Sequence, residues 1–227
     1  MIIGRGLVAS AFLPYFEDDP EVTVFAAGVS NSSETRAEEF LREETLLRPW
    51  LDAAGQFVYF GSCSVLDPHM AQTHYVRHKL QMEALVGSAP GCAIFRLPQV
   101  VGRSPNPNLL ANFLYRKITT GEPFNVWKNA RRNLIDVDDI ASIVAHLVRS
   151  GDTKAGICNI ACPFSASVLE IVETFETVLS QKANYTLVDA GAGYAIDVPE
   201  VRRTAVDLGI SFDAGYLERT VRKYYGN

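Results

Sequence analysis

The sequence of 227 residues lacks any apolar run of the roughly 18 residues that a membrane-spanning helix needs, so we expect no transmembrane helix. It also lacks an excess of positive charge: 21 Lys and Arg stand against 26 Asp and Glu, a net charge of −5. Because surfaces that bind nucleic acid or anionic membranes are usually basic, this balance argues against both kinds of partner. The first residues do not combine a basic region with a long apolar one, so we expect no signal peptide.

Cysteine and histidine are scarce, with four of each. None of the cysteines forms a Cys-x2-Cys pair; they are Cys63, Cys92, Cys158 and Cys162. Because a chain of this length needs no disulfide framework, we expect free thiols in a reducing cytoplasm. His74 and His78 share a helical face, but no carboxylate or cysteine one turn away completes a metal site. We therefore expect solvated helix residues there and no bound metal.

What the sequence contains is an alternation of short apolar runs with longer amphipathic stretches. The apolar runs predict strands at 1–3, 22–27, 57–60 and 92–97. The amphipathic stretches predict helices at 6–16, 33–54, 75–86, 109–118 and 138–148. Strands that alternate with helices indicate βαβ units, and hence an α/β fold with a parallel sheet.

Some finer features can be predicted as well. Ser33 is expected to cap the second helix. In the helix 75–86, the residues Leu80, Ala84 and Leu85 are expected to face the core. The alternation is lost beyond Gly151, where helices are predicted near 167–179 and 217–225. We expect a single domain, 1–227, in which about 151–227 contributes most of a small C-terminal lobe.

The first predicted strand runs directly into Gly4-Arg5-Gly6-Leu7-Val8-Ala9, which fits the pattern G-x-G-x-x-[GA]. Gly4 allows a tight turn, Gly6 lets the backbone approach a pyrophosphate, and the small Ala9 permits close packing of a helix on the sheet. The N-terminus of the helix then faces the phosphates. A short glycine turn is at least as often purely structural, and this one gains weight from its place between a strand and a helix.

A second motif, Tyr75-Val76-Arg77-His78-Lys79, is a Tyr-x3-Lys, with Ser62 thirteen positions upstream. Residues four apart lie on one face of a helix, one turn from each other. An ammonium beside a phenol favours the phenolate, and a nearby serine hydroxyl can hydrogen-bond a substrate oxygen. Together these groups form a proton relay for oxidising an alcohol or reducing a ketone. The spacing arises often by chance, so its order among the other motifs carries the argument.

In this order the motifs resemble those of the extended short-chain dehydrogenase/reductase family, the NAD(P)-dependent sugar-nucleotide epimerases, dehydratases and reductases. Besides the glycine turn and the Tyr-x3-Lys, the segments similar to family motifs are 25–28, 57–65, 95–102 and 132–139. The resemblance implies a Rossmann-like doubly wound parallel sheet with a small C-terminal substrate lobe. It also implies catalytic roles for Ser62, Tyr75 and Lys79.

The resemblance further implies two sets of binding residues. Those expected to bind NADP(H) or NAD(H) are Gly4, Arg5, Gly6, Leu7, Val8, Ala26, Ala27, Gly28, Tyr75, Lys79, Leu97, Pro98 and Val100. Those expected to bind a nucleotide-linked sugar are Ser30, Asn31, Ser64, Gln99, Asn108, Leu109, Trp127 and Arg132. A guanidinium fork matches phosphate oxygens, so Arg132 is expected to grip the diphosphate, with a solvated loop residue as the alternative. Trp127 has a similar alternative as a rim or core residue.

The chain departs from the family pattern on the adenosine side. Only about twenty residues separate Gly6 from Ala27, room for one helix and one strand where the family has more. The segment that usually ends in an acidic residue on the adenosine ribose is missing, so we expect a sheet truncated in its adenosine-binding half. Arg5 offers a cation to a 2′-phosphate, with a solvent-facing turn residue as the alternative. We expect NADP(H) in slight preference to NAD(H).

The segment after the catalytic serine narrows the reaction. A dehydratase of the resembling family has an Asp-Glu pair there, whereas Ser62 is followed by Cys63-Ser64 and the first carboxylate is Asp67. We therefore expect reduction of a nucleotide-linked keto sugar, most simply a 4-keto-6-deoxy hexose, in surface-polysaccharide or deoxysugar biosynthesis. The alternatives are a sugar-nucleotide 4-epimerase and a non-catalytic dinucleotide-binding or sensing protein on the same fold. A homodimer through the helix 75–86, common in the family, is compatible with the sequence.

Overall fold

The computed structural model describes residues 1–51, 55–151 and 156–226. Within these residues the main sheet has five strands, which are, in spatial order, β1 (Ile2–Ile3), β2 (Val22–Phe25), β3 (Gln56–Ser62), β4 (Cys92–Leu97) and β9 (Ile157–Asn159). Every neighbouring pair in the sheet is parallel. The expected α/β class with a parallel sheet is confirmed.

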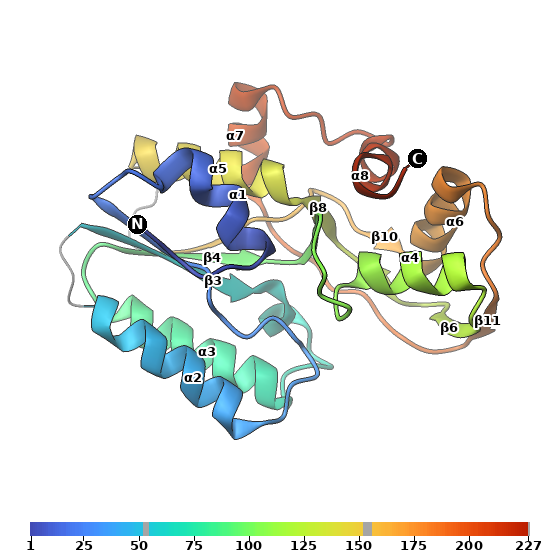
Figure 1. Ribbon diagram of the computed structural model, residues 1–227, viewed down its shortest axis with the longest axis horizontal. Coiled ribbons are helices and arrows are strands. Elements are labelled where there is room, and N and C mark those ends of the chain that lie inside the picture. Colours follow the sequence, from blue (N-terminus) through green and yellow to red (C-terminus); the bar gives the residue numbers. More distant parts are fainter. Residues whose placement is uncertain (52–54, 152–155, 227) are drawn as a thin grey trace.

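Helices cover both faces of this sheet (Figure 1). One face carries α1 (Leu7–Phe16), α5 (Val137–Ser150) and α7 (Pro199–Leu208). The other face carries α2 (Ala37–Leu47) and α3 (His74–Gly87). Because both faces are covered, β3 is buried along almost its whole length, which explains why it reads as a continuous apolar run.

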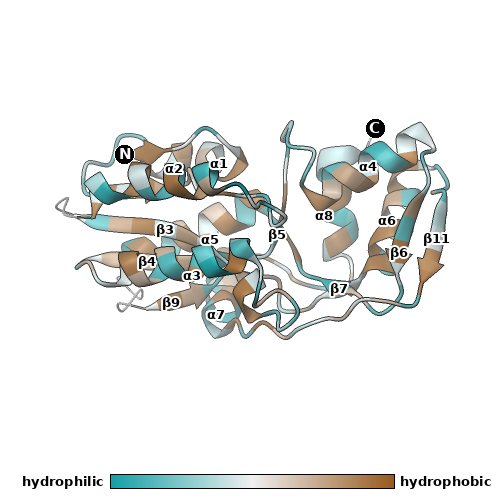
Figure 2. Cartoon of the chain, turned by 90° about the horizontal axis from the view of Figure 1, so that it is seen from below, coloured by the Kyte–Doolittle hydropathy of each residue, from teal (hydrophilic) through white to brown (hydrophobic). Residues whose placement is uncertain are grey.

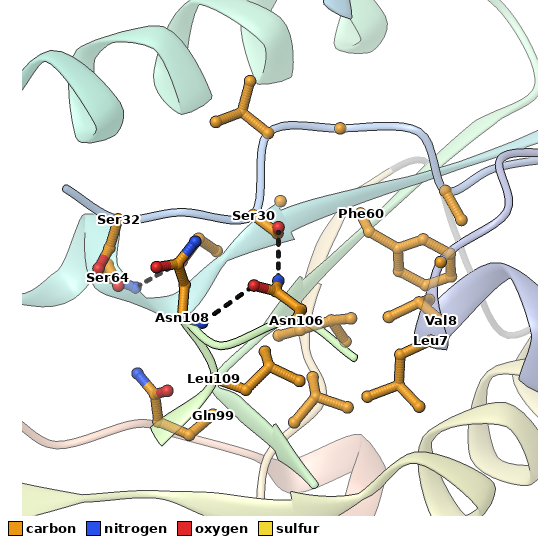
Figure 3. Close-up of a pocket in the computed structure, with 18 of the residues that line it drawn as sticks. Leu7, Val8, Ser30, Ser32, Phe60, Ser64, Gln99, Asn106, Asn108 and Leu109 are labelled. Atoms are coloured by element: carbon orange, nitrogen blue, oxygen red, sulfur yellow. Dashed lines mark hydrogen bonds between the residues drawn. The ribbon is translucent and has the colours of Figure 1, made fainter. Parts of the chain in front are cut away.

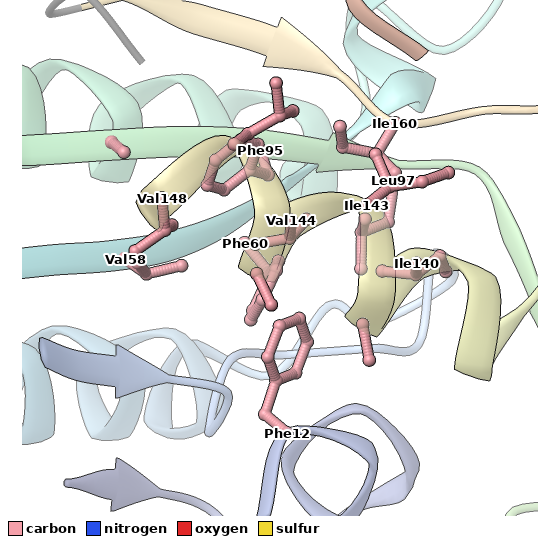
Figure 4. Close-up of a cluster of buried hydrophobic side chains, with 14 of the residues drawn as sticks. Phe12, Val58, Phe60, Phe95, Leu97, Ile140, Ile143, Val144, Val148 and Ile160 are labelled. Atoms are coloured by element: carbon pink, nitrogen blue, oxygen red, sulfur yellow. The ribbon is translucent and has the colours of Figure 1, made fainter. Parts of the chain in front are cut away.

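The largest hydrophobic cluster lies between the sheet and the helices α1 and α5 (Figure 4). Phe12 of α1 meets Phe60 of β3 with ring centroids 5.1 Å apart, and Val144 of α5 packs in the same cluster. A second cluster on the opposite face joins Tyr59 to Met82 of α3 and Leu47 of α2. The helices on both faces are therefore fixed to the strands that carry the site.

The order of the strands shows what the sheet lacks. From β1 to β2 and from β2 to β3 the chain steps in the same direction, yet α1 and α2 lie on opposite faces. Two such crossovers have opposite hands, and one of them must have the rare left hand. In a doubly wound sheet β1 is central and further strands lie on its other side. Within the described residues β1 is instead an edge strand, which confirms the truncation expected from the short Gly6–Ala27 spacing.

A smaller lobe lies beside the carboxyl ends of the strands (Figure 2). It contains the helices α4 (Leu110–Thr120), α6 (Val168–Leu179) and α8 (Tyr216–Tyr225) and the parallel strands β6 (Phe124–Trp127) and β11 (Tyr185–Val188). The lobe is joined to the sheet half by two strand pairs, β5 (Gln99–Val101) with β8 (Leu134–Asp136) and β7 (Arg131–Arg132) with β10 (Ala166–Ser167). It therefore draws on 110–127 as well as on the C-terminal region, whereas β9 and α7 belong to the sheet half.

The start of α5 also anchors the last helix. The Asp136 carboxylate caps α5 by accepting a hydrogen bond from the Asp138 amide at 2.9 Å. Lys223 and Tyr224 of α8 donate to the same carboxylate at 2.7 and 2.6 Å. The aspartates at this point thus cap one helix and hold another.

Two local predictions were wrong. The second helix begins at Ala37, and Ser33 does not cap it: the Ser33 amide donates instead to the Asn31 side chain at 3.1 Å in a loop. That helix ends at Leu47 and continues as a short 3-10 turn, Arg48–Trp50; the remaining predicted residues 52–54 lie outside the described part. On α3, Leu80 is 45% exposed and Ala84 is exposed, because the helix buries a face that carries polar groups.

Among the described residues, no helix is both long enough and apolar enough to span a membrane.

Candidate active site

Most of the predicted site residues surround one cavity of about 260 Å³ at the carboxyl ends of β2, β3 and β4 (Figure 3). The predicted residues that line it are Gly6, Leu7, Val8, Ala26, Gly28, Ser30, Ser62, Ser64, Tyr75, Lys79, Leu97, Pro98, Gln99, Val100, Asn108 and Leu109. Further residues line the cavity that were not among the predicted site residues: Phe25, Val29, Ser32, Phe60, Gly61, Ser104 and Asn106. This edge of a parallel α/β sheet is where such folds place their ligands.

The serine of the predicted relay sits where β3 ends. Ser62 pairs with Leu97 of β4, and its hydroxyl oxygen accepts a hydrogen bond from the Ser64 amide at 3.2 Å. That bond caps a short 3-10 turn, Cys63–Leu66, and fixes the side chain at the cavity wall. Burial raises the pKa of the neighbouring Cys63 thiol to about 12, so this cysteine stays protonated and unreactive.

The tyrosine and the lysine stand one turn apart at the start of α3. The helix is capped by Thr73, whose hydroxyl accepts a hydrogen bond from the Val76 amide at 3.2 Å. This cap places Tyr75 in the first turn, with Lys79 one turn later. Both side chains are buried and line the cavity. The Lys79 Nζ lies 5.9 Å from the centroid of the Tyr75 ring. The structure thus brings Ser62, Tyr75 and Lys79 to one cavity.

Lys79 is paired with a carboxylate that sequence reasoning missed. Its Nζ lies 3.0 Å from Oε1 of Glu43, a residue of α2 with an exposed fraction of 0%. The Tyr59 hydroxyl donates to the same oxygen at 2.7 Å. The other oxygen, Oε2, accepts from the Val29 amide at 2.6 Å and lies 3.0 Å from Nε2 of His78. Glu43 therefore joins α2, α3, β3 and the loop after β2.

The surroundings keep this carboxylate ionised. Burial by itself would raise the pKa of the Glu43 carboxyl, but the Lys79 ammonium and the hydrogen-bond donors hold that pKa below its ordinary value. Burial and the charge of Glu43 raise the pKa of Tyr59 well above its ordinary value, so the Tyr59 hydroxyl stays a donor. The expectation that His78 is a solvated residue was wrong: it is 5% exposed, because its partner comes from another helix.

The glycine turn has a shape that fits a dinucleotide. Gly4 has a φ of +131°, and a Cβ there would stand 2.6 Å from the Ala26 carbonyl oxygen. A Cβ on Gly6 would meet nothing within 4 Å, so space is open over the N-terminus of α1. A pyrophosphate in that space would meet the unpaired amides of the first helical turn.

Polar groups form the wall of the cavity that lies across from Leu7 and Val8 of α1, and we call it the substrate wall (Figure 3). The Asn106 side chain donates to the Ser30 hydroxyl at 3.4 Å and accepts from the Asn108 amide at 3.0 Å. Asn112 of α4 holds this loop through bonds of 2.8 Å to the carbonyls of Ser104 and Asn106. The two predicted residues Ser30 and Asn108 are therefore joined through the side chain of Asn106, which bonds to both. Asn106 was not among the predicted site residues, and its side chain folds the loop because asparagine commonly forms a turn with the residue two positions on.

Other predicted residues lie outside the lining of this cavity: Gly4, Arg5, Ala27, Asn31, Trp127 and Arg132. Arg5 is exposed in the glycine turn. Trp127 is 48% exposed on β6 in the lobe. Arg132 of β7 donates through Nη1 to the carbonyls of Arg131 and Ala192, at 2.8 and 3.3 Å.

A tyrosine that sequence reasoning missed also belongs to the surroundings of the cavity. Burial raises the pKa of Tyr194 to about 12, with Cys63 and Asp67 adding to the shift and Arg132 and the Ser64 hydroxyl opposing it. Because Ser64 lines the cavity, the hydrogen bond between Tyr194 and the Ser64 side chain places Tyr194 at the cavity wall.

Comparison with known proteins agrees with this geometry. The family model described as NAD dependent epimerase/dehydratase family matches residues 5–161. No curated protein has a matching sequence. UDP-N-acetylglucosamine 4-epimerase from Bacillus cereus has a similar structure, with a TM-score of 0.73 and 16% identity over 99% of this chain and 94% of that chain.

Two further solved structures are similar. RMD from Pseudomonas aeruginosa complexed with NADPH gives a TM-score of 0.66 and 15% identity, over 92% of this chain and 82% of that chain. WbmH from Bordetella bronchiseptica in complex with NAD+ gives a TM-score of 0.69 and 18% identity, over 96% of this chain and 79% of that chain. At these identities the likeness establishes the fold.

The family match covers well over half of the chain and includes Ser62, Tyr75 and Lys79. The chain therefore belongs to the NAD dependent epimerase/dehydratase family, and it is an NAD(P)-dependent enzyme of the short-chain dehydrogenase/reductase type.

Proposed function

We propose that the protein reduces the keto group of a nucleotide-linked sugar, most simply a 4-keto-6-deoxy hexose, with NADPH as the favoured reductant. The observation that carries this proposal is the composition of the cavity wall. Ser62, Tyr75 and Lys79 line the same cavity as the glycine turn, and among the described residues none of its lining side chains is an acid. A dehydratase needs such an acid to expel a hydroxyl, whereas ketone reduction needs only a hydride and a proton.

The residues of the relay divide the work between them. When bound, the reduced dinucleotide supplies the hydride for the carbonyl carbon. Ser62 donates a hydrogen bond to the carbonyl oxygen and orients it. Tyr75 gives its phenolic proton to that oxygen, so that the products are an alcohol and a phenolate, which a solvent proton restores. Lys79 stabilises the phenolate and holds the nicotinamide ribose.

The chemistry of the wall also favours a class of sugar. The side chains of the substrate wall carry hydroxyl and amide groups; they are Ser30, Ser32, Ser64, Gln99, Ser104, Asn106 and Asn108. Among the described lining residues the cation is Lys79, and its charge is met by Glu43. Hydroxyls and amides pair well with sugar hydroxyls, while a carboxylate would lack a free cation. We therefore favour an uncharged hexose over a hexuronate.

The test is Tyr75→Phe, which removes the proton donor and leaves the ring. Oxidation of NADPH would be followed with TDP-linked and GDP-linked 4-keto-6-deoxyhexoses as probes. The expected loss in kcat is ~10²–10⁴-fold, the range for general acid catalysis. Tyr115→Phe is the matched control, because Tyr115 lies exposed on α4 and does not line the cavity. Turnover of Tyr75→Phe near the wild-type rate would reject the assignment.

The same preparation separates reduction from its alternatives. A 4-epimerase must keep its dinucleotide through both half-reactions, so the purified protein would carry NAD and would interconvert epimers without added cofactor. The edge position of β1 favours an open adenosine side, and hence exchange of cofactor and reduction. If the protein bound a dinucleotide but turned over neither kind of probe, the non-catalytic alternative would be the better account.

A further inference from the structure

Glu43 is a charged residue on the apolar face of a helix. On α2 it lies three residues after Phe40 and four before Leu47, and Leu47 is fully buried. Phe40 packs on the His78 ring with centroids 4.7 Å apart. A buried ion pair contributes little net stability, and hydrophobic residues of similar volume commonly serve a core as well. The carboxylate at this position is thus better explained by what it does to its partner than by stability.

The carboxylate leaves the Lys79 ammonium little freedom. An ammonium has three N–H donors. Within the described structure, the two carboxylate oxygens of Glu43 accept from Nζ at 3.0 and 3.3 Å, and the Tyr59 hydroxyl oxygen accepts at 3.4 Å. These three contacts hold the ammonium at the wall of the cavity that Lys79 lines.

The loop after β2 closes on the same pair. A Cβ added to Gly28 would stand 2.8 Å from Lys79 Nζ and 2.9 Å from Glu43 Oε1. The next amide, that of Val29, donates to Glu43 Oε2. The ion pair is therefore enclosed by helix, strand and loop, and the position of the ammonium follows the position of the carboxylate.

We propose that Glu43 is a positioning residue of the active site: it holds the Lys79 ammonium at the cavity wall and balances the charge that Lys79 presents to Tyr75. The proposal rests on the proposed function, in which Tyr75 and Lys79 serve proton transfer. The physical reason is that a carboxylate paired with an ammonium offsets the effect of that ammonium on a phenol beside it. Removal of the carboxylate leaves that effect unopposed.

Other titratable groups face this centre from each element packed against it. They are Tyr59 on β3, His78 on α3, and the ion pair of Glu83 on α3 with Arg96 on β4. Arg96 donates to the Glu83 carboxylate at 2.9 and 2.6 Å, and the hydrogen bonds of Lys79 within the described residues go to Glu43 and Tyr59. Glu83 is thus a second buried carboxylate on the neighbouring helix, and it offers a matched control.

The experiment measures phenolate formation by ultraviolet absorbance as the pH is raised. Each protein is compared with its own Tyr75→Phe version, so that the difference isolates Tyr75. We expect Glu43→Gln to move phenolate formation at Tyr75 to lower pH by about one unit or more, the size of effect that one nearby charge produces. Glu83→Gln removes a buried charge and its partner contact without touching Lys79, and it should leave that titration in place.

This measurement needs no substrate, so the inference and the proposed function can fail separately. If the titration moves but no keto sugar is reduced, the reaction is wrong and the role of Glu43 stands. If Glu43→Gln is folded by circular dichroism and Tyr75 titrates as in wild type, Glu43 is only structural and the inference is overturned. An equal shift in Glu83→Gln would overturn it as well, because the effect would not depend on contact with Lys79.

A second variant covers the case in which Glu43→Gln does not fold. Glu43→Asp keeps the charge but withdraws it by one methylene from Lys79. The titration of Tyr75 should then change little, whereas NADPH binding, measured by its fluorescence, should weaken by about tenfold because the ammonium is displaced from the cavity wall. Wild-type affinity for NADPH in a folded Glu43→Asp would overturn the positioning role.

Discussion

The carbonyl oxygen of Ala26 lies 2.6 Å from the position that a Cβ atom on Gly4 would occupy. The close approach of β1 and β2 thus excludes a side chain in the turn, and the φ of +131° excludes it again. We expect Gly4→Ala to lower the free energy of unfolding by ~1–3 kcal/mol or more, the usual cost of such backbone strain. It should also weaken NADPH binding, since the turn must shift; urea unfolding and NADPH fluorescence measure the two effects.

Gly209→Ala is the control for this change. Gly209 also has a positive φ, +67°, but a Cβ there would meet nothing within 4 Å. The strain should cost ~1–2 kcal/mol and leave NADPH binding unchanged, because α7 lies away from the glycine turn. Normal NADPH binding by Gly4→Ala would contradict our view of the turn.

The buried ion pair between Lys79 and Glu43 predicts that a second substitution will restore part of the stability lost by the first. Lys79→Met leaves the Glu43 carboxylate buried without its cation, and loss of one partner of a buried pair commonly costs ~3–5 kcal/mol. The double variant Lys79→Met/Glu43→Gln removes the orphaned charge as well, so it should be more stable to urea than Lys79→Met alone. A double variant that is no more stable than the single one would show that the pair is not coupled in the folded state.

Much of the site was predictable because its motifs are local. The glycine turn, Ser62 at the end of a strand and the Tyr-x3-Lys are each defined by residues close in sequence, and the fold brings them to one edge of the sheet. The truncated sheet was also predictable, since the number of residues between Gly6 and Ala27 limits how many strands fit there.

What the sequence did not reveal depends on contacts between distant segments. Glu43 and Lys79 are 36 residues apart, and nothing in the spacing along α3 indicates that partner. The burial of His78 and the exposure of Leu80 have the same cause, because α3 turns its polar side towards Glu43. A usable signal did exist: an acidic residue between Phe40 and Leu47 interrupts the apolar face of α2.

The proposed preference for NADPH is tested at Arg5. The residue is exposed in the glycine turn, directly after the edge strand β1. If its guanidinium meets the 2′-phosphate, Arg5→Ala should lose ~1.5–3 kcal/mol of NADPH binding and little of NADH binding. Titration calorimetry with both dinucleotides decides the matter. Equal losses for the two would make Arg5 an ordinary turn residue.

The nucleotide part of the substrate is tested at Arg132. Within the described residues, the hydrogen bonds of its guanidinium run through Nη1 to two backbone carbonyls. The carbonyls fix the direction of the side chain, and a planar fork so held can meet phosphate oxygens with its other N–H groups. We therefore expect UDP, TDP, GDP or CDP to bind the wild type, and Arg132→Ala to weaken that binding by about tenfold or more.

The neighbouring arginine makes this last prediction specific. Arg131 is exposed, and its guanidinium donates to the Ser165 carbonyl, so Arg131→Ala removes the same charge one residue away. A diphosphate held by the fork of Arg132 should be weakened by Arg132→Ala far more than by Arg131→Ala, whereas simple attraction to a basic loop would make the two losses equal. NADPH binding should hardly change in either variant, because the pyrophosphate of the dinucleotide is expected at Gly6. If no nucleoside diphosphate binds the wild type at millimolar concentration, the substrate is not a sugar nucleotide, and a smaller ketone must be sought for the cavity beside Tyr75.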